Sequence, residues 1–408
     1  MTDIMACDLV PLRERGLFMG VLFEVFAVGT STGPWVGGSL VTNTTWRWVF
    51  YLNIPIGSVG LVLLIAFLQV SYKKEFTLME KLKRVDFFGN AVLMASVVSI
   101  LFAVTYGGTR YSWSSLRIIA PLVLGGVGMA AFQVFEGSSY CIEPTIPWRL
   151  FKNRTSASAF AISFLHAMLT LWVIYILPIY FQAPLGSTAS RSGVQLLPTI
   201  TTLLCFASIS GVFVTKTGRY RPVHLLGTAL MILGFGLFSL MDATSSPAKW
   251  ITFQIIVAAG AGMMLPTLLP AVQADLQESD TATATGTWNF IRSFGVIGGI
   301  SIPTTIFNNQ FDHMSSQIRN LAVRASLSHG RAYSHVSRDF VKSFPNPLRD
   351  EIIGAYSESM TLVWQVAISF AGLTFLLVFL EKEIKLRTEL ETEYGRKEKP
   401  SKLPLATE

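Results

Sequence analysis

The chain has 408 residues, of which 51% are hydrophobic and only 14% are charged, and its formal net charge is +7 at pH 7. A soluble domain usually carries about 25% charged residues, so this composition excludes an ordinary water-soluble globular protein. The excess of Lys and Arg does not indicate nucleic-acid binding, because many basic residues stand in short clusters between apolar runs, as loops of a membrane protein do.

Apolar windows recur along the whole sequence, and a helix needs roughly 20 apolar residues to cross a bilayer. The windows run near 17–40, 49–69, 86–106, 117–136, 157–181, 194–214, 222–241, 250–273, 285–307 and 360–380. Helices satisfy their own backbone polar groups in lipid, whereas an open sheet cannot. The sequence therefore predicts an all-α integral membrane protein with about ten transmembrane helices.

The first window contains small residues at a spacing that favours close helix packing. Gly29, Gly33 and Gly37 recur every four residues, so they share one helix face that a neighbouring backbone can approach. Pro34 removes a backbone donor beside this face and predicts a kink. An ordinary packing seam and a moving hinge both fit this pattern. The glycines and the proline of this window, which we treat as one motif, are Gly20, Gly29, Gly33, Pro34, Gly37 and Gly38.

Two titratable residues inside the windows are candidates for function, because a charge within a membrane helix costs about 2.5–3.5 kcal/mol on insertion scales. Glu24 could carry a coupling proton, since burial tunes carboxyl groups toward both protonation states. It could also lie at the interface, paired with Arg15 or a lipid headgroup. His166 could titrate near neutral pH or be a hydrogen-bonded core histidine.

Polar and aromatic residues of the later windows offer candidates for substrate contact. Arg292 and Asn289 share a helix face in the ninth window, where they could bind an anionic group. The alternative is an arginine that snorkels to the interface. Gln254, Gln273 and Trp288 could line a polyspecific cavity, and packing or interfacial roles remain open for each of them.

The loops predict the orientation of the chain. Basic residues concentrate in the even-numbered loops and both tails, so both termini are expected to be cytoplasmic. The long connection 308–359 then lies outside. Its histidines follow no compact metal-ligand spacing, so we expect a solvated loop and no metal site. Asn43 begins an Asn-Thr-Thr glycosylation pattern on the same side.

Signatures of enzymes are not found in the sequence. There is no Ser/His/carboxylate set in a triad context and no Gly-rich phosphate-binding motif, so we expect neither catalysis nor direct use of ATP, and no cofactor.

The glycine series from Gly20 to Gly38 matches the antiporter signature of the major facilitator superfamily, which lies in the fifth helix of its drug:proton antiporters. The stretch 8–16 resembles their preceding loop, and 46–57 is similar to the segment that opens their sixth helix. The stretches 288–295 and 385–390 resemble the fungal fourteen-span branch. The resemblance covers essentially the whole chain and implies a major facilitator type helix bundle.

On this mapping the family's first four helices are absent, so the chain is expected to be N-terminally truncated. A partial echo of the family's gating loop stands at Gly211, Gly218, Arg219 and Arg221, with Thr215 where the family has an aspartate. The expected parts are a cytoplasmic start 1–16, a two-helix remnant 17–70, two extra central helices 71–156, a six-helix bundle 157–380 and a cytoplasmic tail 381–408.

The resemblance implies a secondary transporter that exports small amphipathic compounds, such as drugs, toxins or secondary metabolites, in exchange for protons. Its partners would be the substrate, protons and the lipid bilayer, with no nucleic acid, and we expect a monomer. The plasma membrane is the expected location and the vacuolar membrane is the alternative. The rival hypothesis is a non-transporting membrane remnant or an inactive fragment of such an exporter.

Overall fold

The computed structural model describes most of the chain from residue 47 onward and scattered residues before it. The described residues are Val10, 12–15, 17–18, 20–21, 25, 29, 36, 40, 44–45, 47–67, 70–71, 86–108, 111–138, 141, 144–277, 280–328, 330–387 and 395–396. They are almost entirely helical, so the all-α prediction is confirmed for this part of the chain.

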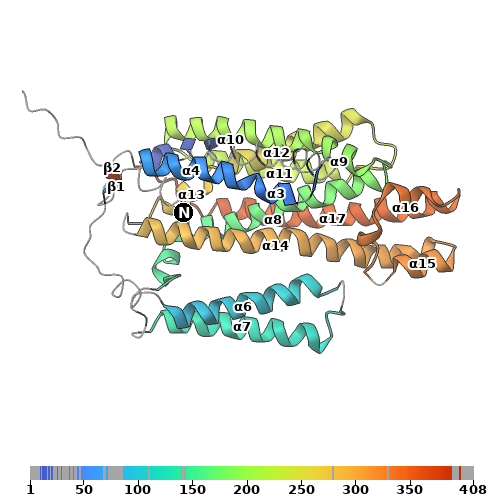
Figure 1. Cartoon of the computed structure of the whole chain (residues 1–408), viewed down its shortest axis with the longest axis horizontal. Coiled ribbons are helices and arrows are strands. Elements are labelled where there is room, and N and C mark those ends of the chain that lie inside the picture. Colours follow the sequence, from blue (N-terminus) through green and yellow to red (C-terminus); the bar gives the residue numbers. More distant parts are fainter. Residues whose placement is uncertain are drawn as a thin grey trace, which may run out of the picture.

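The elements follow one another as helices joined by short connections (Figure 1). The long helices are α4 (Asn53–Phe67), α6 (Phe87–Tyr106), α7 (Leu116–Glu136), α8 (Arg154–Gln182), α10 (Leu197–Thr217), α11 (Arg221–Phe238), α12 (Pro247–Met264), α14 (Thr281–Met314) and α17 (Leu348–Val378). The short elements are α3 (Arg47–Tyr51), η1 (Trp148–Phe151), α9 (Ala189–Gln195), α13 (Leu268–Gln273), η3 (Ser315–Gln317), α15 (Leu321–Leu327), η4 (Tyr333–His335) and α16 (Arg338–Lys342). The two-residue strands β1 (Val70–Ser71) and β2 (Gly395–Arg396) pair antiparallel.

Among the described residues, nine helical segments are long and apolar enough to cross a membrane. They correspond to the second to tenth predicted windows. The first window, 17–40, lies mostly outside the described residues, and every residue described within it is helical. The helices α14 and α17 extend beyond their apolar windows, so the connection between them is 315–347 rather than the expected 308–359.

Proline and glycine mark several helix ends. Proline occupies the first turn of α10, α11 and α12, where the missing N–H has no helical partner to lose. Gly218 ends α10 in the left-handed conformation, with φ +70°, which glycine adopts without strain. These signals produce the sharp turn between α10 and α11.

The core of the molecule lies around α8, which packs against α14, α17 and α13. Gly295 and Gly299 of α14 lie directly against the carbonyl groups of Phe164 and Met168 in α8, where no Cβ would fit. Such close contact of backbones replaces the hydrophobic driving force that lipid does not provide. Figure 1 shows α6 and α7 as a hairpin beside α14, on the side away from α10 to α12.

The two ends of the bundle differ. We call the end with Arg13, the α10–α11 turn and residues 379–387 the tail end, since these segments contact one another there. The opposite end carries the connection 315–347, and we call it the loop end. Figure 1 shows α15 and α16 projecting at the loop end.

Candidate functional site

The glycine-rich signature of the first window is described only in part. Gly20 lies against α10, because a Cβ on Gly20 would be 3.9 Å from the carbonyl oxygen of Ala207 and 4.0 Å from the Cα of Ser208. A Cβ on Gly29 would meet no atom within 4 Å. The first predicted helix thus lies beside α10 at Gly20, with room for a Cβ in ordinary van der Waals contact. The remaining members of the signature and two other predicted positions lie outside the described residues: Gly33, Pro34, Gly37, Gly38, Glu24 and Asn43.

Three of the predicted site residues lie within about one turn of one another on α14: Trp288, Asn289 and Arg292. The indole Nε1 of Trp288 donates a hydrogen bond to the Oγ of Ser163 in α8, at 2.9 Å. The guanidinium of Arg292 lies 5.1 Å from the centre of the Trp288 ring, one turn further along α14. Asn289 Nδ2 donates to the carbonyl of Thr285 at 3.2 Å. Arg292 is thus placed over an aromatic face, an arrangement that stabilises a cation.

Two other predicted residues connect neighbouring helices through their side chains. The Nε2 of His166 in α8 lies 2.9 Å from the carbonyl oxygen of Ala261 in α12. The Oε1 of Gln254 in α12 accepts a hydrogen bond from Thr199 in α10, at 2.8 Å. Both His166 and Gln254 are fully buried. These contacts favour the packing interpretation for both residues.

Gln273 lies in a second buried network, at the tail end. Its Oε1 accepts a hydrogen bond from the guanidinium of Arg15 at 2.8 Å, and its Nε2 donates to Thr285 at 2.8 Å. Arg15 is 1% exposed and also donates to the carbonyl of Val10. The segment before the first window is therefore attached to α13 by a buried cation, and Gln273 in turn connects α13 to α14.

The echo of the gating loop is bound by the C-terminal segment that follows α17. Gly218 accepts a hydrogen bond from the backbone N–H of Leu386, at 3.3 Å. Arg219 pairs with Glu383 at 3.1 Å, and Arg221 donates to the carbonyl of Phe379 at 3.5 Å. Gly211 lies further back in α10, where it is buried and does not belong to the turn. Three of the four predicted residues thus meet one partner segment.

The same turn is also bound by the N-terminal segment. The Nε of Arg13 donates to the carbonyl of Thr215 at 2.6 Å, and its guanidinium also donates to the carbonyl of Lys216. The backbone N–H of Arg13 donates to the carbonyl of Arg387 at 3.0 Å. Together, Arg13, the turn 215–221 and the segment 379–387 form what we call the tail-end latch.

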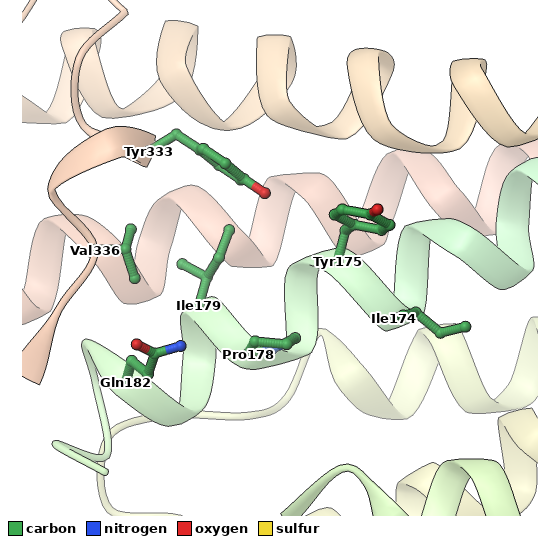
Figure 2. Close-up of a pocket in the computed structure, with 7 residues that line it drawn as sticks. All are labelled: Ile174, Tyr175, Pro178, Ile179, Gln182, Tyr333 and Val336. Carbon is green, nitrogen blue, oxygen red and sulfur yellow. The ribbon is translucent and has the colours of Figure 1, made fainter. Parts of the chain in front are cut away.

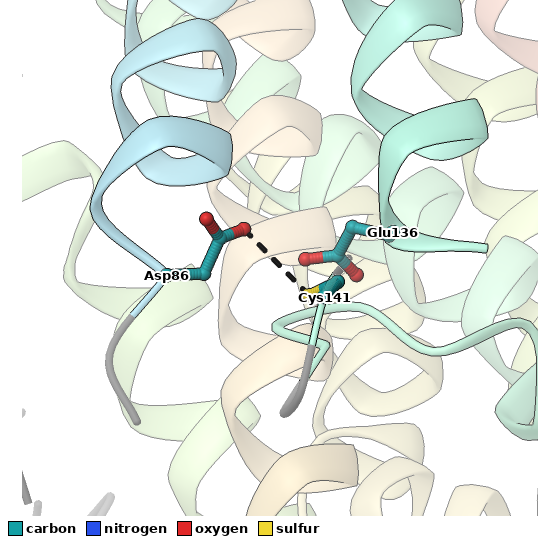
Figure 3. Close-up of side chains that lie close together, drawn as sticks. All are labelled: Asp86, Glu136 and Cys141. Atoms are coloured by element: carbon teal, nitrogen blue, oxygen red, sulfur yellow. Dashed lines mark hydrogen bonds between the residues drawn. The ribbon is translucent and has the colours of Figure 1, made fainter. Parts of the chain in front are cut away.

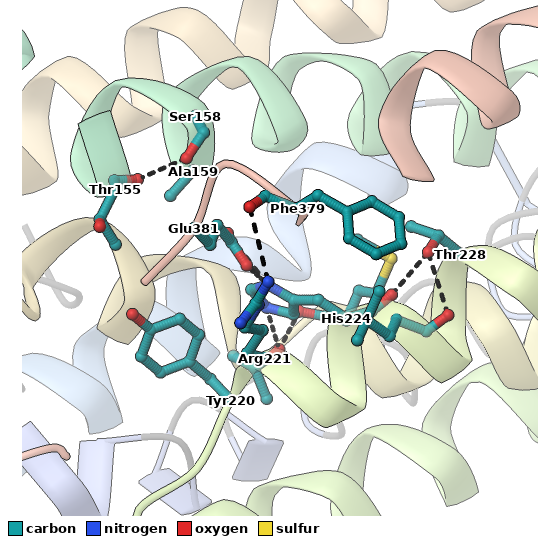
Figure 4. Close-up of polar contacts among 12 residues, drawn as sticks. Thr155, Ser158, Ala159, Tyr220, Arg221, His224, Thr228, Phe379 and Glu381 are labelled. Atoms are coloured by element: carbon teal, nitrogen blue, oxygen red, sulfur yellow. Dashed lines mark hydrogen bonds and ion pairs between the residues drawn. The ribbon is translucent and has the colours of Figure 1, made fainter. Parts of the chain in front are cut away.

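A buried pair that the sequence did not predict lies beneath this latch (Figure 4). The Nδ1 of His224 is 2.9 Å from an oxygen of Glu381, and neither side chain is exposed. The Nε2 of His224 is 2.9 Å from the hydroxyl of Thr267. Beside this pair, Tyr220 donates to the carbonyl of Lys382 at 2.6 Å. Burial first, and the charge of Glu381 second, raise the pKa of the Tyr220 hydroxyl well above its usual 10.0.

A cluster of ligand-type side chains joins the ends of α6 and α7 (Figure 3). Oxygen and sulfur atoms of Asp86, Glu136 and Cys141 lie within 4.8 Å of one another. The two Glu136 oxygens accept N–H groups of Thr145 and Ile146, at 2.6 and 2.7 Å. Asp86 caps α6 through the N–H of Gly89. Because these hydrogen bonds already engage both carboxylates, we interpret the cluster as a set of contacts that holds the ends of α6 and α7 together.

A pocket of about 390 Å³ lies at the loop end, between α8 and η4 (Figure 2). Sequence reasoning missed it, because one of its walls comes from Tyr333 and Val336, far from α8 in the chain. None of its lining residues belongs to the set predicted from the sequence.

Comparison with known proteins gives consistent matches. A family model described as Major Facilitator Superfamily matches residues 1–300. The chain is 48% identical to the MFS-type transporter gkaD of Penicillium citrinum, over 98% of this chain and 69% of that relative. It is 46% identical to the MFS-type efflux transporter ffsH of Aspergillus flavipes and 48% identical to the MFS-type efflux transporter phmH of Phaeosphaeria nodorum. These two matches cover 98% and 97% of this chain, and 71% of each relative.

Proposed function

Because the chain belongs to the major facilitator superfamily, we propose that it is a proton-coupled exporter of small amphipathic organic compounds, such as drugs, toxins or secondary metabolites. The chain is a multi-pass membrane transporter for small molecules rather than an enzyme. Coupling to protons and the amphipathic substrate class are the parts that the proposal adds.

The observation that carries the proposal is identity of 46–48% over nearly the whole chain with fungal proteins named for efflux. The names of these relatives support the direction of transport. None of the comparisons favours the non-transporting alternative.

Proton coupling is assigned to Glu24 in this proposal. It is an acidic residue inside the first window, and a carboxyl group in a membrane helix can exist in both protonation states. The stacked pair of Arg292 and Trp288 is proposed as a substrate contact, since a cation on an aromatic face offers both charge and an apolar surface. His166, Gln254 and Asn289 would support the helices around it.

Transport in this proposal proceeds by rocking of two helix bundles about a central site. The contact of Gly20 with α10 lies where the first predicted helix meets the C-terminal bundle. The tail-end latch would hold one of the two states, because it joins Arg13 to segments of the C-terminal bundle. The basic residues of the tail-end latch predict that the tail end faces the cytoplasm and that the loop end faces outward. We expect a monomer in the plasma membrane, with the vacuolar membrane as the alternative.

The test is an efflux assay in yeast cells that lack their own broad-specificity exporters. Cells that express the chain are loaded with a panel of toxic amphipathic compounds, and retention and growth are compared with those of an empty-vector strain. The proposal predicts lower retention and better growth for at least one compound, with loss of the effect when a proton ionophore is added. Equal retention for every compound, with the chain present in the membrane, would support the non-transporting alternative.

A further inference from the structure

The pocket at the loop end has the size and composition of a binding site for a small molecule. Its volume of about 390 Å³ lies within the roughly 300–1,000 Å³ that such sites occupy. One wall is the last turns of α8, and the other is the connection around η4. Figure 2 shows Tyr333 extending from this connection over α8, toward Tyr175.

The wall around η4 is held in place by contacts with α14 and α17. The backbone N–H of Tyr333 donates to the Oδ1 of Asn308 at 3.1 Å. Tyr356 donates to the carbonyl of Ala332 at 3.0 Å, and the Tyr333 ring meets Phe307 edge-on at 6.4 Å. Because a preformed wall needs little ordering when a ligand binds, these contacts favour binding.

The lining combines an apolar surface with uncharged polar groups. Its apolar members are Ile174, Pro178, Ile179 and Val336. Its polar members are Tyr175, Gln182 and Tyr333, and none of these seven residues carries a charge. Tyr175 is 41% exposed, and burial raises the pKa of Tyr333, which keeps the Tyr333 hydroxyl neutral. This lining would not compensate for the desolvation of a charged ligand.

The backbone of α8 adds a hydrogen-bond acceptor at the same place. Pro178 has no N–H to donate to the carbonyl of Ile174 one turn earlier, so the usual helical hydrogen bond is missing there. Ile174 and Pro178 both line the pocket. A hydroxyl group of the ligand could therefore donate to the carbonyl of Ile174, which in a regular helix would accept the N–H of residue 178.

From these observations we infer that the loop-end pocket binds an uncharged amphipathic molecule that carries hydroxyl or carbonyl oxygens. The tyrosine hydroxyls and the Gln182 amide would contact the oxygens, and the aliphatic wall would cover the apolar body. The inference rests on the proposed export function and narrows its substrate class from amphipathic compounds in general to neutral oxygenated ones. It also places a binding site on the side where an exported molecule is released.

The experiment uses two photoreactive probes with the same apolar body. One is para-hydroxymethylbenzophenone, which is neutral, and the other is para-benzoylbenzoate, which is an anion. The purified full chain in lipid nanodiscs is irradiated with each probe, and labelled peptides are mapped by mass spectrometry. We expect saturable labelling by the neutral probe of the last turns of α8 and of residues 333–336, with at least tenfold weaker labelling by the anion.

The variant Tyr175→Phe/Tyr333→Phe keeps both rings and removes two hydroxyls. Because one hydrogen bond changes affinity by about threefold to tenfold, we expect labelling in the pocket to require roughly tenfold more probe. Tyr51→Phe removes the hydroxyl of another exposed tyrosine and should leave labelling unchanged. Thermal unfolding of all variants verifies that they fold.

Other labelling patterns would count against the site, and the efflux assay separates the site from the proposed function. Labelling spread evenly over the lipid-facing helices, unaffected by the variants, would indicate partition into lipid only. Preference for the anion would contradict the neutral class. In the efflux assay, export that fails while the pocket still binds the neutral probe would overturn the proposed function and leave the site. Intact export of neutral compounds without labelling of the pocket would overturn the site and leave the function.

Discussion

His224 and Glu381 form a buried contact between the start of α11 and the segment after α17, with 2.9 Å between Nδ1 and Oε2. The two residues are 157 positions apart in the sequence, and neither side chain is exposed to solvent. Thr267 completes the contact from the other side of the imidazole ring. One polar cluster thus fixes α11, the start of α13 and the C-terminal segment relative to one another.

Removal of Glu381 should therefore destabilise the tail end strongly. For Glu381→Ala we expect a loss of about 3 kcal/mol in the free energy of unfolding, because a buried polar partner is left uncompensated. The matched control is Glu383→Ala, whose exposed pair with Arg219 should contribute less than about 1 kcal/mol. Thermal and denaturant unfolding of the purified variants measures both values. Equal losses for the two variants would contradict the role of the buried contact.

The contact between α14 and α8 predicts a contrast between two glycines of one helix. A Cβ on Gly295 would overlap the carbonyl of Phe164, whereas a Cβ on Gly286 would meet nothing within 4 Å. Gly295→Ala should lower the free energy of unfolding by about 2 kcal/mol, since overpacking typically costs about 1–3 kcal/mol. Gly286→Ala should be neutral or stabilising by up to about 1 kcal/mol through helix propensity. Unfolding midpoints in detergent would show this contrast, and a stable Gly295→Ala would refute the close crossing.

Tyr220 predicts how the tail end responds to alkaline conditions. Its pKa in the folded protein is raised above the 10.0 of an exposed tyrosine, so its contribution to stability is present below that value. This contribution is lost as the pH rises above about 10, where the unfolded chain ionises first. Tyr220→Phe cannot ionise, so the melting temperature of this variant should fall less steeply at alkaline pH. Parallel curves for wild type and variant would exclude this contribution.

Glu24 provides the test of how transport is coupled. In Glu24→Gln the side chain keeps its size but cannot release a proton, so accumulation driven by a pH gradient should fall at least tenfold. Exchange of labelled for unlabelled substrate at equal pH should continue, because it needs no net proton movement. Glu14→Gln, at an exposed position before the first window, is the control and should behave as wild type. Gradient-driven uptake that survives in Glu24→Gln would remove this carboxyl group from the mechanism.

The spans could be predicted from sequence because apolar composition alone decides which segments enter lipid. The ends of α14 and α17 could not, since polar residues such as Asp312 and Asp350 continue these helices beyond the apolar windows. The residues of the gating-loop echo lie in and around a turn that Gly218 ends in the left-handed conformation. Its partners were not foreseen, because Phe379 and Glu383 reach it only through packing of α11 against α17.

The sequence allowed us to choose candidate residues by their type and spacing, but not to predict which residues of other helices they contact. Trp288 and Arg292 are one turn apart on a helix, so their proximity follows from helical spacing. The bonds of His166 to Ala261 and of Gln254 to Thr199 depend on which helices are neighbours. The pocket at Tyr333 depends on the course of a connection between helices, for which the sequence contains no periodic signal.

The most direct test of proton-coupled export is substrate uptake into proteoliposomes that contain the purified chain and an acidic interior. A radiolabelled compound that the cells export should accumulate inside, and a pH-sensitive dye should report protons that leave as it enters. A proton ionophore should abolish both signals. Uptake no greater than in protein-free liposomes, or uptake that ignores the pH gradient, would contradict the account.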